Sequence, residues 1–188
     1  MEISKLIDIL AVAEKLKCNT RHCDTTSGRR ESVAEHSWRT ALMAMLVADE
    51  FPKADMDKVI RMCLIHDLGE AFTGDIPTFE KKDSDEKTEE RLLLSWVDSF
   101  PEPAKTEFTG LFREMAEKQT LEARIYKALD NMEAVIQHNE SDISTWLPLE
   151  YDLQLTYGEE NVKFSPYMQQ LKDYVNEQTR QKITGAEH

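Results

Sequence analysis

The sequence predicts an all-α fold, and three observations support this prediction. Only 6 of the 188 residues are Gly and 6 are Pro, and long stretches lack both, which favours helices over short strands joined by turns. Hydrophobic residues make up 40% and charged residues 31% of the chain, as is typical of a soluble globular protein. Apolar residues also recur at helical spacing along most of the chain. We therefore expect a single helical domain over residues 1–188, with a substantial core.

Composition also excludes several classes of protein. No segment approaches the roughly 18 uninterrupted apolar residues of a membrane span, and the N-terminus lacks the basic and apolar blocks of a secretion signal. The three cysteines have no metal-binding spacing and are expected to be reduced thiols in a cytoplasmic protein. A formal net charge of -13 disfavours polymeric nucleic acid as a partner. A substrate would then be a small molecule, because local cations and a metal can set the field inside a pocket.

In the first half of the chain, apolar spacing predicts a helix over residues 3–17, followed by an irregular basic loop over 18–31. Ser32 and Glu35 fit a capping box, so a helix should begin there and run to about Glu50. Its apolar residues point in nearly all directions, which predicts a centrally buried helix. Pro52 ends that helix, and the next should begin near Asp55.

The second half begins with Gly69, Gly74 and Pro77, which predict a short helical turn and then a loop. The charge run 83–90 is interpreted as the solvated start of a helix. Further helices are expected over residues 87–100, 103–118, 121–140 and 166–182. Residues 141–163 have mixed character and no assignment, and residues 184–188 should fray.

The dipeptide His66-Asp67 ends an apolar run over residues 59–65, and the acids Glu70 and Asp75 follow. Burying such groups is costly unless they are hydrogen-bonded or coordinate a metal. Neighbouring helical residues lie about 100° apart, so this pair can still converge on one ion between helices. The alternative is a helix C-terminus at which His66 interacts favourably with the helix dipole.

His36, then His66-Asp67, then Asp130 have the order of motifs found in the HD-domain phosphohydrolases. The segments Glu-Ser-Val-Ala-Glu-His-Ser, His-Asp-x-x-Glu and Thr-Gly-Asp-Ile-Pro-Thr resemble, more closely, the YfbR-like 5'-deoxynucleotidases and their HD-domain-containing relatives. The resemblance covers roughly residues 16–139. It implies an HD-domain helical bundle with a central metal site, and also a homodimer.

By this resemblance His36, His66, Asp67 and Asp130 would ligate one divalent ion. Two imidazoles and two carboxylates suit Mn²⁺, Co²⁺, Ni²⁺, Fe²⁺ or Zn²⁺ better than Ca²⁺. From the residues alone, however, Asp130 is interpreted as a solvent-facing acid. It points away from the expected core stripe of its helix, which consists of Ile125, Ala128, Leu129, Met132, Val135 and Ile136.

Glu70 and Asp75 match the catalytic acids of the family. An acid near a metal-bound water can orient the water or accept its proton. A second acid, if protonated, can give its proton to the leaving alkoxide. For Asp75 the alternative is a turn residue, because Thr-Gly-Asp-Ile-Pro is typical of turns.

A phosphate monoester beside so many acids needs cations. Arg21 stands at the same distance before the first metal His as the family's phosphate-binding Arg, and Lys81 follows the Asp75 loop. The loop contains three arginines, Arg21, Arg29 and Arg30. For at least two of them the alternative to phosphate binding is that the side chain is simply solvated at the surface. His22 replaces a family Trp that helps to reject the ribose 2'-hydroxyl, so it is a candidate sugar or base contact, and the deoxyribose preference stays open.

The expected activity is metal-dependent hydrolysis of nucleoside 5'-monophosphates, mainly 2'-deoxy, to nucleoside and phosphate. One alternative is an HD phosphohydrolase acting on a deoxynucleoside triphosphate, an alarmone or a cyclic dinucleotide. Another is a non-catalytic regulator that binds nucleotide and metal, and a third is a purely structural helical bundle. His138 is expected to be an exposed helix residue and Cys63 a core residue.

Overall fold

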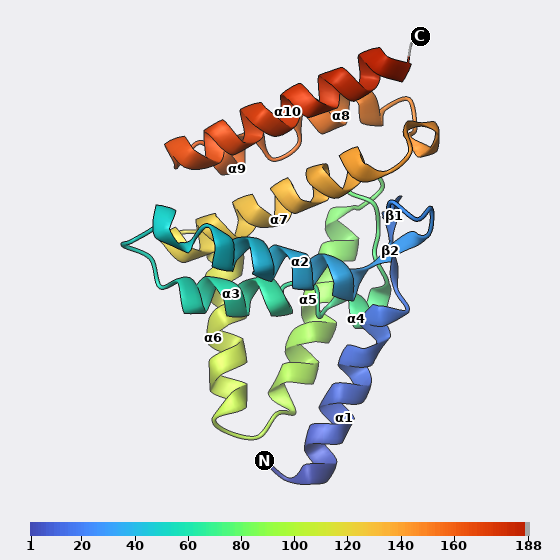
Figure 1. Cartoon of the computed structure of the whole chain (residues 1–188). Coiled ribbons are helices and arrows are strands. Elements are labelled where there is room, and N and C mark those ends of the chain that lie inside the picture. The colour runs from blue at the N-terminus through green and yellow to red at the C-terminus, as the bar shows by residue number, and fades with distance from the viewer. Residues whose placement is uncertain (187–188) are drawn as a thin grey trace.

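The computed structural model describes residues 1–186 and consists mainly of α-helices, which confirms the all-α prediction (Figure 1). In chain order the elements are α1 (Ile3–Ala13), η1 (Glu14–Lys17), β1 (Thr20–Asp24), β2 (Arg30–Ser32), α2 (Val33–Leu46), η2 (Ala48–Glu50), α3 (Met56–Ile65), α4 (Glu70–Thr73), α5 (Asp83–Asp98), α6 (Ala104–Glu117), α7 (Leu121–Glu140), η3 (Ile143–Thr145), α8 (Glu150–Thr156), α9 (Glu159–Val162) and α10 (Pro166–Ala186), where η marks a short 3₁₀ helix.

Helices α2, α3 and α7 contact one another and form the centre of the protein. Figure 1 shows α10 on the other side of α7, and α5, α6 and α1 extending away from α2 and α3. The largest fully buried side chains come mainly from these elements, among them Met62 on α3 and Ile125, Leu129 and Met132 on α7. Because α2, α3 and α7 also carry the predicted metal ligands, packing of the core determines the geometry of that site.

The predicted capping box at the start of α2 is confirmed. The Ser32 hydroxyl accepts a hydrogen bond from the Glu35 backbone amide at 3.3 Å, and the Glu35 carboxylate accepts one from the Ser32 amide at 2.9 Å. These bonds satisfy backbone amides that have no partner within the helix. They fix the start of α2 one turn before His36.

The expectation that α2 is buried on all sides is wrong. Trp38 is 61% exposed and Leu46 is 76% exposed, while Val33 and Ala44 are fully buried. The physical reason is that α3 and α7, the two long helices that pack against α2, bury one side of it and leave its outer apolar residues largely exposed. The helix also ends at Leu46, and a separate 3₁₀ turn continues to residue 50.

The expected basic loop over residues 18–31 is instead largely an antiparallel hairpin of β1 and β2, with Thr20 opposite Ser32. Its turn contains Gly28 at φ 79°. The carbonyl of Asp24 accepts hydrogen bonds from Ser141 Oγ at 2.7 Å and Gln137 Nε2 at 2.9 Å, and both donors are far away in the sequence. Because these bonds to the end of α7 are long-range, the polar local pattern did not reveal the strand.

The remaining helices lie close to their predicted ranges, and α5 begins at Asp83 within the charge run. Residues 141–163, which had no assignment, form η3, α8 and α9. Residues 184–188 were expected to fray, and this is wrong for residues 184–186 because α10 continues through Ala186. The last two residues of that range, 187 and 188, lie outside the described residues. Between residues 1 and 186, no helix is long and apolar enough to cross a membrane.

Lys172 on α10 is buried and forms no ion pair within residues 1–186. Its ammonium group donates one hydrogen bond to the Gln154 carbonyl at 3.1 Å. Burial lowers the pKa of Lys172 from its usual 10.5 to about 8. The charged form therefore destabilises the folded state at neutral pH.

We expect Lys172→Met to raise the free energy of unfolding at pH 7 by roughly 1 to 3 kcal/mol, because the substitution removes a buried charge. The folded protein loses the Lys172 proton near pH 8 and the unfolded chain near pH 10.5, so the cost is complete below pH 8 and disappears as the pH rises to 10.5. Urea denaturation across this range should show the advantage of the variant shrinking. Lys182→Met on the same helix is the control, and an advantage that does not change with pH would contradict the prediction.

Candidate metal centre and adjoining pocket

The structure brings the four predicted metal ligands together. His36 lies on α2, His66 and Asp67 follow the last residue of α3, and Asp130 lies on α7. His36 Nε2 is 3.2 Å from His66 Nε2 and 3.1 Å from Asp130 Oδ1. Asp67 Oδ2 lies 3.1 Å from His66 Nε2 and 3.7 Å from His36 Nε2. Donor atoms from three helices therefore face one small volume.

These distances fit donors that share a divalent ion. Ligands that bind one ion at about 2.1 Å lie roughly 3 to 3.5 Å from one another. Asp67 Oδ2 is buried and has no hydrogen-bond partner among the described residues, as expected of an atom that binds an ion. The set of two imidazoles and two carboxylates suits a transition metal, consistent with the preference expected from the sequence.

Groups behind the ligands hold the imidazoles in this orientation. His66 Nδ1 lies 2.8 Å from the carbonyl oxygen of Cys63, which leaves Nε2 directed into the site. His36 Nδ1 contacts the carboxylate of Glu133, which is fully buried. Sequence analysis missed Glu133. Its position one helical turn after Asp130 places it on the same side of α7, and this spacing was the available signal.

The interpretation of Asp130 as a solvent-facing acid is wrong, since the residue is only 8% exposed. Helix α7 is enclosed by α2, α3 and α10, so residues beside its core stripe are also covered. The Lys127 ammonium donates a hydrogen bond to Asp130 Oδ2 at 2.6 Å. Burial favours the neutral acid, but Lys127 and the two imidazoles hold the pKa of Asp130 well below its usual value. Asp130 is therefore a carboxylate in the folded protein.

Glu70 and Asp75 lie beside this cluster. Glu70 is the first residue of α4 and is 5% exposed, and its Oε2 has no hydrogen-bond partner in the described part of the chain. Burial, reinforced by the charges of Asp67 and Asp75, raises the pKa of Glu70 to about 9. Burial also raises the pKa of Asp75, although the Arg21 guanidinium opposes this shift. Both shifts favour the protonated acid, and that of Glu70 is large enough for it to hold a proton near neutral pH.

Arg21 is the nearest arginine to the cluster. Its Nη1 lies 3.7 Å from Asp67 Oδ2 and its Nε lies 3.3 Å from Glu31 Oε2. Because the buried Nε faces the Glu31 carboxylate, the Nη groups of Arg21 are the ones that remain to bind a ligand. Arg29 and Arg30 are exposed and form ion pairs with Glu35 and Asp24.

Lys81 differs from Arg21 in its surroundings. Its ammonium donates a hydrogen bond to Glu89 at 2.8 Å. It lines a groove between α5, α6 and α7 that also includes His66, rather than the pocket that contains Arg21.

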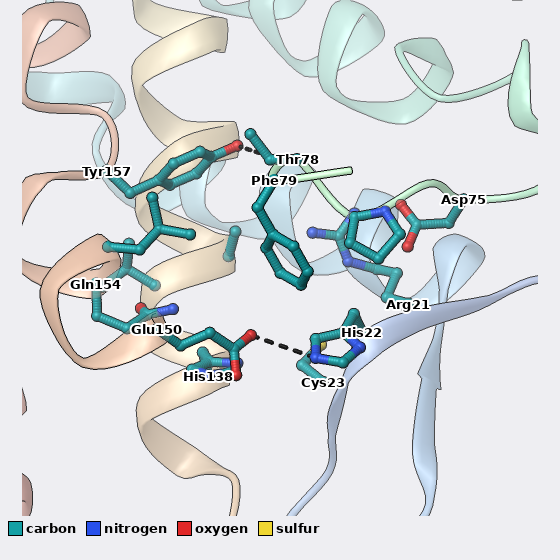
Figure 2. Close-up of a pocket in the computed structure, with 14 residues that line it drawn as sticks. Arg21, His22, Cys23, Asp75, Thr78, Phe79, His138, Glu150, Gln154 and Tyr157 are labelled. Atoms are coloured by element: carbon teal, nitrogen blue, oxygen red, sulfur yellow. Dashed lines mark hydrogen bonds and ion pairs between the residues drawn. The ribbon is translucent and has the colours of Figure 1, made fainter. Parts of the chain in front are cut away.

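The pocket next to Arg21 and Asp75 is shown in Figure 2. His22 lines it and forms an edge-to-face pair with Phe79, with ring centroids 5.4 Å apart. His22 Nε2 lies 3.3 Å from Glu150 Oε1. The opposite wall consists of residues from α7, from α8 and from the position directly after α8, namely Ala134, Val135, His138, Glu150, Leu153, Gln154 and Tyr157.

His138 was expected to be exposed, and this expectation is wrong because only 5% of the residue is accessible. The Trp146 ring covers it at a centroid distance of 4.5 Å, and the Trp146 indole donates a hydrogen bond to the His138 carbonyl. Residues 141–157 return over the end of α7 and bury this side chain. No structure was predicted for residues 141–163, so the burial of His138 by this segment could not be predicted either.

Comparisons with known proteins agree with this architecture. Residues 13–172 match the sequence model of the family described as HD domain. The 5'-deoxynucleotidase HDDC2 of Bos taurus is 31% identical over 159 residues, which cover 83% of this chain and 76% of that protein. The human 5'-deoxynucleotidase HDDC2 is 32% identical over 114 residues, which cover 60% of this chain and 55% of that protein. The match to the human relative therefore spans only about half of its length.

Solved structures show the same fold. The crystal structure of a protein described as a predicted metal-dependent phosphohydrolase, from Magnetospirillum magnetotacticum MS-1, superposes with a TM-score of 0.80. The two chains are 26% identical, and the superposition covers 97% of this chain and 93% of the other. The family model spans most of the sequence, and the helices bring together the histidines and aspartates by which the chain resembles that family. The chain therefore belongs to the HD domain family.

Proposed function

We propose that the protein is a metal-dependent phosphohydrolase that cleaves nucleoside 5'-monophosphates, mainly 2'-deoxyribonucleotides, to nucleoside and phosphate. The observation that carries this proposal is the cluster of His36, His66, Asp67 and Asp130, together with Arg21, which lies beside Asp67 and also lines a pocket. The relatives named 5'-deoxynucleotidase support the choice of substrate.

His36, His66, Asp67 and Asp130 would hold one divalent ion, either Mn²⁺, Co²⁺, Ni²⁺, Fe²⁺ or Zn²⁺. When bound, such an ion polarises a phosphate oxygen and makes water a better nucleophile. Arg21 would bind the phosphate through the Nη groups of its guanidinium, while Nε stays beside Glu31. Lys81 is a second candidate for this role, but it must first leave Glu89.

The two acids would move protons at opposite sides of the phosphorus. Glu70 would orient the attacking water and accept its proton as the carboxylate. Burial and the negative charge of Asp67 raise the pKa of Glu70, and a divalent ion bound next to Asp67 would offset that charge and so would favour this ionised form. Asp75, whose pKa burial raises, would give a proton to the departing 5'-oxygen of the nucleoside. His22 would contact the sugar or base, because it lines the same pocket as Asp75.

We also infer a cytoplasmic location and a homodimer. The location rests on the unpaired state of Cys18, Cys23 and Cys63. The dimer is supported by the exposed apolar residues on the outer face of α2, which include Trp38, Met45 and Leu46. The molar mass in solution, measured by light scattering, would distinguish a dimer from a monomer.

The metal-loaded protein should release inorganic phosphate from 2'-deoxyribonucleoside 5'-monophosphates. A panel of monophosphates, triphosphates, an alarmone and a cyclic dinucleotide, assayed with each metal in turn, tests the substrate class. Release of pyrophosphate or triphosphate from a triphosphate would favour the alternative HD activities. No turnover of any monophosphate with any of the five metals would reject the proposal.

Glu70→Gln should lower kcat about 100-fold or more, because an amide cannot accept the proton of the attacking water. Metal binding should persist, since Glu70 is not among the four proposed ligands. Steady-state kinetics and calorimetric metal titration measure the two effects. Glu80→Gln, at an exposed site in the following loop, is the matched control. A Glu70→Gln variant with wild-type kcat would exclude this role.

Glu133→Gln should weaken metal binding by roughly 10- to 100-fold, because the carboxylate orients His36 from behind. Titration of the metal-free protein with Mn²⁺ or Co²⁺ in a calorimeter gives the affinity. Glu140→Gln, an exposed acid further along α7, should bind metal as the wild type does. Equal affinities in all three proteins would argue against an orienting function.

A further inference from the structure

The pocket beside Arg21 has a second group of buried polar side chains that the proposed chemistry does not use. They are Glu150, His138 and Gln154, which are 3%, 5% and 7% exposed. Figure 2 shows Arg21 and Asp75 on one side of the pocket and these three residues on the other, with Phe79 between them. The group therefore lies away from the place where the phosphate would bind.

Two of these residues lack a hydrogen-bond partner for a buried atom. His138 Nε2 and Gln154 Oε1 make no hydrogen bond with any described residue. Leaving such an atom unsatisfied costs about 1 to 3 kcal/mol, so it indicates a missing partner. Both residues line the pocket, and a ligand there can supply the partner.

Glu150 adds a carboxylate to the same place. Its Oε2 accepts a hydrogen bond from the Leu147 amide at 2.6 Å, and its Oε1 lies 3.3 Å from His22 Nε2. His138 Nε2 lies 3.5 Å from Oε2 without forming a hydrogen bond. Burial lowers the pKa of His138 to about 4, so its neutral ring does not balance the charge. The Glu150 carboxylate and the Gln154 amide oxygen therefore offer hydrogen-bond acceptors on this side of the pocket, beside the neutral His138 ring.

The remaining walls suit a flat ring or a sugar. Phe79 and His22 present their rings, while Val135 and Leu153 add apolar surface. Ligand sites commonly combine such apolar walls with a few polar groups that determine specificity. Here the polar groups are the acceptors of Glu150 and its neighbours.

We propose that Glu150, together with the Gln154 amide oxygen beside His138, recognises the nucleoside by accepting hydrogen bonds from two neighbouring donors. The inference rests on the proposed function, because Arg21 and Asp75 then hold the phosphate end. The N1–H and 2-amino groups of guanine offer such a pair in a 2'-deoxynucleoside. The 2'- and 3'-hydroxyls of ribose offer another, and their recognition would change the sugar preference proposed above to ribose while keeping the phosphohydrolase activity. Thymine, whose single N–H lies between two carbonyls, matches these acceptors poorly.

Calorimetric binding of free nucleosides tests the inference without requiring turnover. Guanosine, deoxyguanosine, deoxyinosine and thymidine are titrated into metal-loaded wild type and Glu150→Gln. The amide retains an acceptor for Leu147 but loses the charge, so binding of the preferred nucleoside should weaken about 10- to 100-fold. Asp152→Asn removes an exposed carboxylate from the same helix and should leave binding unchanged.

The four nucleosides distinguish the two donor pairs. Tighter wild-type binding of guanosine than of deoxyguanosine would identify the ribose hydroxyls, and tighter binding of deoxyguanosine than of deoxyinosine would identify the guanine edge. Glu150→Gln should lose whichever preference is found. Equal binding of all four nucleosides by the wild type, or unchanged binding in the variant, would overturn the inference.

Kinetics separate recognition from general damage. With the preferred nucleotide, Glu150→Gln should raise KM and largely retain kcat, while hydrolysis of p-nitrophenyl phosphate, which has no nucleoside, should not change. Equal loss with both substrates would overturn the inference.

If the wild type binds nucleosides as expected but cleaves no phosphate ester, only the proposed function fails. Should Glu150→Gln not fold, Gln154→Leu replaces it, and nucleoside binding about threefold weaker or more is expected.

Discussion

The convergence of His36, His66, Asp67 and Asp130 between α2, α3 and α7 is the constraint on which the rest of the structure depends. An isolated buried carboxylate costs several kcal/mol, and here two of them lie among the most tightly packed helices. The surrounding groups reduce this cost. Lys127 pairs with Asp130, and Arg21 lies beside Asp67. A divalent cation would complete the compensation, which explains why such polar residues occur in the centre of the protein.

Two kinds of group surround these ligands: groups that contact the imidazoles from behind, and acids that lie beside the cluster. Glu133 contacts Nδ1 of His36, and the Cys63 carbonyl contacts Nδ1 of His66. The Nε2 atoms of both imidazoles are therefore free to bind a metal ion. Glu70 and Asp75 lie close enough to other acids that burial and repulsion raise their pKa values. This difference in environment separates carboxylates that can bind a cation from carboxyl groups that can transfer protons.

The ligand cluster and the pocket are built from different parts of the chain. The ligands lie on or beside the long central helices, whereas the pocket joins the β1–β2 hairpin and the loop at residues 75–79 to α7 and α8. Only α7 contributes to both, through Asp130 and His138. Variation in the segments that line the pocket could therefore change the nucleoside that is bound and leave the metal ligands in place.

The sequence by itself determined the features that depend on neighbouring residues. The capping box of Ser32 and Glu35, the span of α7 and the location of His66 at the end of α3 all follow from local hydrogen bonds and apolar spacing. The order of the metal motifs was also sufficient to indicate the family. Only the tertiary structure decided that Asp130 and His138 are buried, that α2 has an exposed apolar face, and that a hairpin precedes it. Each of these depends on contacts between residues far apart in the sequence, and no local pattern records which elements will cover a given side chain.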